Sequence, residues 1–162
     1  MADTYAHSMF QSGTVDYYPP SNENPGNPVQ RASGKYEFDG NQSNNDVLRI
    51  LKGIPANAIV NRILLKTDGL TGLSDVNVGL YKTNLGAVKD DNCFGDAVTL
   101  ASASKVLDGM KNVAIENFVK KVLEHAGDTE GSHSPSYDIA LTLIAAGSAS
   151  GTIAWEVEWQ FG

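Results

Sequence analysis

The sequence has little cysteine and few basic residues. Of its 162 residues one is a cysteine, so no disulfide can form within the chain and the fold must be held by packing. Twelve lysines and arginines are outnumbered by nineteen acidic residues, which gives a net charge of −7 at pH 7. This balance would repel a phosphate backbone, so we expect no nucleic-acid partner.

Long apolar runs are missing as well. No stretch approaches the ~20 apolar residues that span a bilayer. The first residues also lack the basic end and the apolar run of a signal peptide. We therefore expect no membrane partner and synthesis in a cytoplasm. The length is near the common size of one domain, so one core is expected.

Catalytic and metal-binding motifs are not found either. His125 and His133 are eight positions apart with no third ligand, a spacing that matches no common zinc arrangement. The segment 39–43 begins like a calcium loop, but Asn44 stands where the loop needs glycine. Cys93 has no convincing histidine and acid partners. We predict no catalytic residue, no metal site and no cofactor, and hence that the protein is not an enzyme.

Residues 1–33 differ in composition from the rest and predict an extended N-terminal arm. They hold four of the six prolines, which lack the donor that a helix or a sheet needs. They also hold apolar and aromatic residues, which inert linkers usually lack. Such an arm either lies over its own domain or docks on a neighbouring subunit. The candidate subunit-binding residues are Tyr5, Met9, Phe10, Val15, Tyr17, Tyr18, Pro19 and Pro20.

Residues 34–162 alternate short apolar runs with turn residues, a pattern typical of a mainly antiparallel β domain. Strands are expected over 35–38, 46–52, 59–66, 74–82, 137–145 and 152–161. Within 59–66 the pattern places Ile59, Ile63 and Leu65 on one face. The alternation in 74–82 predicts one buried face and one that is at least partly wet.

The last two strands have the clearest patterns. The segment 137–145 is apolar on both faces, which predicts a central strand. In 152–161 one face carries only apolar residues: Ile153, Trp155, Val157, Trp159 and Phe161. We assign this row to the core, because an exposed apolar row of this size would promote aggregation. The small, polar connector 146–151 suits a hairpin loop.

One amphipathic helix is predicted over 113–125. Its apolar residues fall at the spacing of a single stripe: Ile115, Phe118, Val119, Val122 and Leu123. Asn112 can cap the first turn, and Gly127 suits the left-handed position after the last turn. We expect this helix to pack across an edge or an open end of the sheet.

Five segments follow one another in a familiar order: GIPANAIVNRI at 53–63, VNVGLYKT at 76–83, GAVKDDNCF at 86–94, YDIALTL at 137–143 and GTIAWEVEWQF at 151–161. With this order the body resembles the capsid decoration (cement) proteins of tailed bacteriophages, which have a jelly-roll-like β-sandwich. The N-terminal third of the chain lies outside the resemblance.

The resemblance implies a protein that is added to the outside of an assembled phage head and clamps neighbouring major capsid subunits. Its partners would be the major capsid protein and further copies of itself, with a trimer favoured over a dimer. The arm residues would then bind the capsid, and the protein would lie on the outer surface of the virion. Two alternatives stay open: another virion component, such as a head fibre base, neck or tail protein, and a carbohydrate-binding module that uses Trp155 or Trp159.

Overall fold

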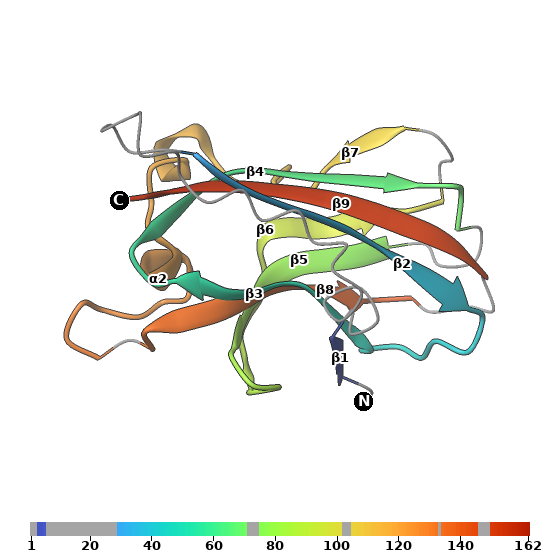
Figure 1. The fold of residues 1–162 in the computed structure, drawn as a ribbon, viewed down its shortest axis with the longest axis horizontal. Helices are drawn as coiled ribbons and strands as arrows, with labels where there is room; N and C mark the ends of the chain where they lie inside the picture. Colours follow the sequence, from blue (N-terminus) through green and yellow to red (C-terminus); the bar gives the residue numbers. More distant parts are fainter. Residues whose placement is uncertain (1–2, 6–28, 71–74, 102–104, 133, 146–149) are drawn as a thin grey trace.

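The computed structural model describes residues 3–5, 29–70, 75–101, 105–132, 134–145 and 150–162. These residues form two sheets that lie one above the other as the layers of a sandwich (Figure 1). One sheet has the strand order β1-β3-β8-β5-β6, and the other has the order β2-β9-β4-β7. Paired strands run antiparallel, except that β1 runs parallel to β3. The predicted antiparallel β-sandwich is confirmed.

The strands of the five-stranded sheet are β1 (Asp3–Tyr5), β3 (Val47–Pro55), β8 (Ser136–Leu143), β5 (Asp75–Lys82) and β6 (Val88–Thr99). Those of the four-stranded sheet are β2 (Gln30–Asp39), β9 (Ser150–Phe161), β4 (Ala58–Thr67) and β7 (Val106–Asp108). Two short helical segments precede β8: η1 (Ile115–Asn117) and α2 (Val122–His125).

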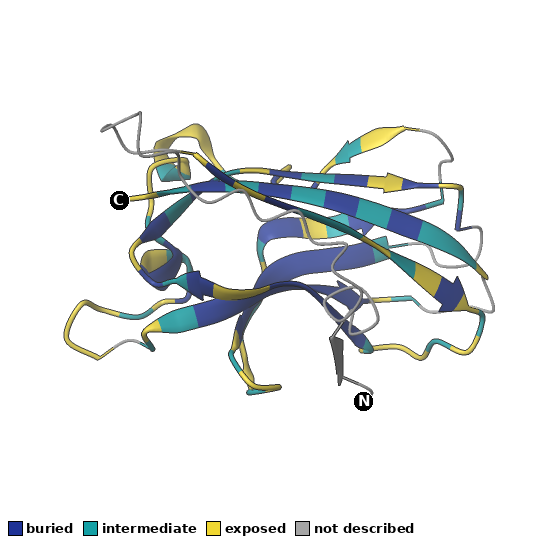
Figure 2. Cartoon of the chain, in the orientation of Figure 1, coloured by how far each residue is buried: buried dark blue, intermediate teal, exposed yellow. Residues whose placement is uncertain are grey.

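Strand β9 buries its aromatic face as the sequence predicts. Buried and half-buried residues alternate along the strand (Figure 2). Trp155 is 5% exposed and Trp159 is 6% exposed, so both indole rings belong to the core. Phe161, the last of the predicted row, is instead 41% exposed. It lies opposite Ala58, the first residue of β4, at the end of the ladder between β9 and β4.

Strand β8 is central, as predicted: it lies between β3 and β5 and is buried from Tyr137 to Leu143. The prediction of a partly wet face on β5 is wrong, because β5 is buried on both faces. The backbone of β6 lies directly on this face, since a Cβ atom added to Gly79 would lie 2.1 Å from the carbonyl oxygen of Asp90. The side-chain amide of Asn77 also donates a hydrogen bond to the carboxylate of Asp91 in β6 (3.0 Å).

A β-bulge in β4 changes the face assignment made from sequence. The pairing with β9 shifts between Val60 and Arg62, so one extra residue separates the two halves of the strand. Val60 therefore shares the buried side with Ile63 and Leu65, whereas Ile59 is only half-buried. The expectation for Ile59 is wrong for this reason.

The connection between β8 and β9 is not a hairpin, although the composition of 146–151 suits one. β8 belongs to the five-stranded sheet and β9 to the four-stranded sheet, so the chain crosses from one layer to the other. At the start of the body, β2 begins at Gln30 and pairs with β9 from there. Residues 30–33, placed in the arm by composition, are therefore part of the sheet.

The predicted helix over 113–125 is wrong in extent. Only η1 and the four-residue α2 are helical in this region. Lys121 is extended (φ −69°, ψ 154°) and pairs with Ile59, which interrupts the helix before Val122. Asn112 caps nothing here, because its side-chain oxygen accepts from the backbone of Asp96 (2.9 Å). Gly127 does take the left-handed conformation after α2 (φ 69°).

Candidate docking surface

The structure describes one of the eight candidate residues of the arm. Tyr5 ends β1, opposite Arg49 in the parallel ladder with β3, so the first strand joins the edge of this chain's own five-stranded sheet. The other seven lie outside the described residues: Met9, Phe10, Val15, Tyr17, Tyr18, Pro19 and Pro20. Their binding role stays a prediction.

Four apolar side chains in the segment 106–119, which begins with β7 and ends before α2, are exposed. We call this group the 106–119 surface and define it by four residues with their exposed fractions: Val106 (62%), Ile115 (85%), Phe118 (43%) and Val119 (74%). Three of them were expected to pack inward as the stripe of a helix. Because the helix does not form, they are exposed to solvent instead, and Phe118 lines a common hollow with Val106.

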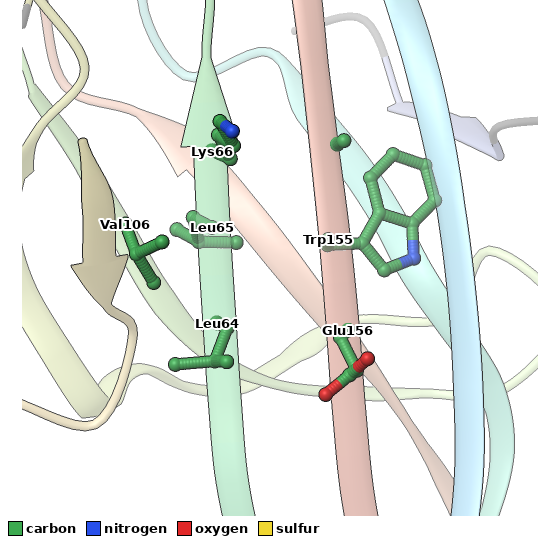
Figure 3. A pocket seen from close by; sticks show the side chains of 7 residues that line it. Leu64, Leu65, Lys66, Val106, Trp155 and Glu156 are labelled. Carbon is green, nitrogen blue, oxygen red and sulfur yellow. The ribbon is translucent and has the colours of Figure 1, made fainter. Parts of the chain in front are cut away.

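The 106–119 surface borders a hollow in the outer side of the four-stranded sheet. This hollow of about 370 Å³ is lined by Asn61, Arg62, Leu64, Val106, Asp108, Met110 and Phe118. A second hollow of about 220 Å³ shares Leu64 and Val106 with the first and extends over β4 and β9 towards Trp155 (Figure 3). Together they form a shallow, mainly apolar depression.

Four charges stand in a row beside this depression, on the outer face of β2, β9 and β4. Arg62 binds both Glu156 (2.9 Å) and Glu158 (2.8 Å), and Arg31 binds Glu158 (2.9 Å). Exposed ion pairs of this kind contribute little to the free energy of unfolding. They do give the rim of the depression a fixed pattern of alternating charge, which favours one orientation of a partner over others.

A fully buried ion pair lies in the other sheet. The Arg49 guanidinium binds the Asp138 carboxylate (3.0 Å), and neither side chain is exposed to solvent. The guanidinium also donates to the carbonyl oxygens of Lys82 (2.8 Å) and Gly86 (2.9 Å) and lies over the Tyr81 ring at 5.0 Å from its centre. This network therefore ties β3 and β8 to the turn that joins β5 to β6.

The titratable groups with shifted pKa values lie elsewhere and do not converge on the depression. Burial raises the pKa of the Cys93 thiol, which disfavours the reactive thiolate. Burial and the nearby Lys120 lower the pKa of His125, whose ring lies 5.0 Å from that of Phe94. Hydrogen bonds from Lys89 and Tyr137 lower the pKa of Asp128.

The part of the chain that the structure describes holds neither a metal cluster nor a membrane-spanning helix. Within it, no three histidine, cysteine, aspartate or glutamate side chains gather closely enough to hold a metal ion. None of its helices has the length and apolar character needed to cross a membrane.

The fold is shared with chains of two phage capsid structures. One is the capsid of Ralstonia phage GP4, matched at 17% identity over 99% of both chains with a TM-score of 0.62. The other is the cyanophage Pam1 capsid asymmetric unit, matched at 18% identity over 90% of this chain and 92% of that one with a TM-score of 0.53. No family model and no curated protein matches the sequence. At such low identity the similarity concerns the fold.

Sequence reasoning missed the 106–119 surface because it read apolar spacing as a helical stripe. A warning was present in the sequence: Val113, Ile115, Asn117, Phe118 and Val119 all have low helix propensity, and no alanine-rich or leucine-rich turn compensates. The depression could not be read from the sequence at all, because it joins β4 and β9 to β7 across the sheet.

Proposed function

We propose that this protein is a structural component of a phage virion that decorates the outside of the head and holds neighbouring major capsid subunits together, without catalytic activity. The observation that carries the proposal is the match over 99% of both chains to a chain in the capsid of Ralstonia phage GP4. Coverage of nearly all of both chains means that the matched chain has about the size of this one. The similarity thus extends over the complete sandwich rather than over a common sub-structure.

The surface chemistry supports a protein partner. The 106–119 surface offers apolar side chains beside a shallow depression, and the charged row of Arg31, Arg62, Glu156 and Glu158 gives it a polar rim. An apolar centre with a polar rim is the usual composition of a protein–protein contact. We propose that it binds the major capsid protein, and that many copies acting together produce a large total stabilisation from modest individual contacts.

The arm and the oligomeric state belong to the same proposal. Residues 6–28 follow β1 and precede β2 in the sequence, and their aromatic and proline residues suit contact with a neighbouring subunit. We propose a homo-oligomer, a trimer in preference to a dimer, on the outer surface of the capsid. The mass of the free protein measured by light scattering tests this part.

The direct test is attachment to phage heads that lack the protein. Purified protein is mixed with such heads, the heads are sedimented, and the bound protein is quantified on gels. We expect saturable attachment and a higher temperature of head disruption. A variant without residues 1–28, which leaves β2 complete, is expected to attach more weakly while keeping the near-ultraviolet circular dichroism of the buried Trp155 and Trp159. Heads that bind no full-length protein would contradict the proposal.

Imaging of decorated heads tests the proposed location, because a neck or tail protein would appear at one vertex only and a head fibre base would carry a projecting fibre. The carbohydrate-binding alternative gains no support from the two tryptophans, since both rings are in the core and form no exposed platform. Titration with sugars while Trp fluorescence is recorded is expected to give no shift.

A further inference from the structure

Strand β2 presents a long and regular outer edge. It pairs with β9 on one side along its whole length without a register shift, and no strand of the described residues lies on its other side (Figure 1). The other outermost strands differ: β1 and β7 have three residues each, and the pairing of β6 with β5 shifts register at three places. Short strands and bulges protect sheet edges from further pairing, and β2 has neither.

The outward side chains of β2 carry their charges in two blocks. Residues two positions apart share a face of a strand, so Arg31 and Lys35 lie on the same face as Glu37 and Asp39, and all four are exposed. The basic pair comes first and the acidic pair follows. Charges on an edge usually keep other strands away, but this arrangement favours one partner. An antiparallel strand of the same sequence would bring the acidic half of one copy against the basic half of the other.

The charges also select the register of such a pair. One register places Arg31 of each copy opposite Glu37 of the other and pairs residues 30–38 of both strands. The next possible register places Lys35 opposite itself, and like charges directly opposite are destabilising. The register after that places Lys35 opposite Glu37 but pairs only residues 33–39. The first register therefore combines the longest ladder with opposite charges at both ends.

The two residues of this charge pair are suited to the contact in different ways. Glu37 is exposed opposite Thr152 of β9 and makes no ion pair with any described residue of its own chain. Arg31 is held over the sheet by Glu158 (2.9 Å). A guanidinium has five donors, so Arg31 can keep this bond and bind a second carboxylate.

We propose that two copies of the protein pair through their β2 edges, antiparallel and with Arg31 of each opposite Glu37 of the other. Their four-stranded sheets then join into one continuous sheet. The backbone hydrogen bonds of the new ladder supply affinity, and the charges fix the register. The inference goes beyond the proposed function, because the contact needs no phage head. It has twofold symmetry, so it joins copies in pairs in addition to any contact that forms a trimer.

The first test measures self-association of the free protein by sedimentation velocity at low ionic strength, where exposed charges are least screened. Glu37→Arg places arginine opposite arginine, and Arg31→Glu places glutamate opposite glutamate. Each variant alone is expected to associate at least tenfold more weakly than wild type. An equal mixture of the two restores opposite charges at both pairs and is expected to associate within about threefold of wild type. Glu116→Arg makes the same charge change at an exposed residue of η1 and should associate like wild type.

A second test traps the register and does not depend on the charge variants. Residue 33 of one copy lies opposite residue 35 of the other in the proposed ladder. The double variant Ser33→Cys, Lys35→Cys is expected to give a species of twice the chain mass on non-reducing gels after mild oxidation. Lys35→Cys alone, which would cross-link in the next register, is expected to give much less. Wild type controls for Cys93, which is partly buried.

The outcomes decide the proposal. Equal association of Glu37→Arg and wild type, or a mixture no better than the separate variants, overturns the pairing. Free wild type of three copies that stays at three copies in Glu37→Arg also overturns it. Pairing seen only after removal of residues 1–28 would assign the β2 edge to the chain's own arm and overturn the contact in the full chain. Attachment of Glu37→Arg to phage heads is measured separately, so failure of the pairing leaves the proposed function standing.

Discussion

Replacement of Arg49 by methionine is the most direct test of the buried network in the five-stranded sheet. Methionine fills much of the space of the arginine stem but carries no charge and no donor. The variant would leave the Asp138 carboxylate in a site without solvent exposure after the loss of its guanidinium partner. The carbonyl oxygens of Lys82 and Gly86 would each lose a donor as well.

The expected loss follows from these contacts. Removing one partner of a buried ion pair typically lowers the free energy of unfolding by about 3–5 kcal/mol. For a domain of this size each kcal/mol lowers the melting temperature by about 2–4 °C, so we expect a fall of roughly 6–20 °C. The control is Arg62→Met, which breaks exposed ion pairs with Glu156 and Glu158 and should lower the free energy of unfolding by less than about 1 kcal/mol.

Urea denaturation followed by tryptophan fluorescence measures both variants, because Trp155 and Trp159 are buried and their emission shifts when the core opens. A loss below about 1 kcal/mol in Arg49→Met, or an equal loss in Arg62→Met, would refute the reasoning. The double variant Arg49→Met, Asp138→Leu removes both charges and is expected to regain most of the lost stability, since an apolar pair can replace a buried ion pair.

Three further predictions concern packing, pH and attachment. Gly79→Ala should lower the free energy of unfolding by about 1–3 kcal/mol in urea titrations, because its Cβ would meet the backbone of β6, whereas Gly131→Ala, with open space around it, should be neutral. The pKa of Asp128 is lower in the folded protein than in the unfolded chain, where it is near 4. The ionised carboxylate therefore stabilises the fold at a pH above 4, and this stabilisation is lost as the pH falls through the folded pKa. Lys89→Met should make the melting temperature depend less on pH between pH 5 and pH 2.5. Phe118→Ser should keep the melting temperature within about 2 °C, since the side chain is half-exposed, yet weaken attachment to heads; equal attachment would exclude the 106–119 surface.

The strands could be predicted where one face is buried and the other is not. The period-2 pattern of β9 identifies its core face correctly down to Trp159, and the apolar character of β8 identifies a central strand. The errors arise where a neighbour in space decides the outcome. The wet face expected on β5 is covered by β6, and the bulge in β4 moves Ile59 off the buried side.

The candidate site was less accessible to sequence reasoning than the fold. Apolar spacing over 113–125 predicts a helix, but Lys121 pairs with β4 in an extended conformation and leaves Ile115 and Phe118 outside. The buried ion pair of Arg49 and Asp138 is equally hidden, because the two residues are 89 positions apart in the chain. Contacts of this range depend on the register of β3 and β8, which no local pattern specifies.

The strand order β2-β9-β4-β7 has a consequence for how the protein folds. β9 lies between β2 and β4 although it follows both by more than 80 residues, so neither can be paired on that side until the last strand is in place. Ladders that join such distant segments close late, because the loop entropy has to be overcome before any contact forms. Until then two long strand edges are open to other chains, so a high concentration of newly made protein favours intermolecular pairing over the native sheet. We expect the yield of refolded protein to fall steeply with concentration, and the slow step of folding to be the insertion of β9.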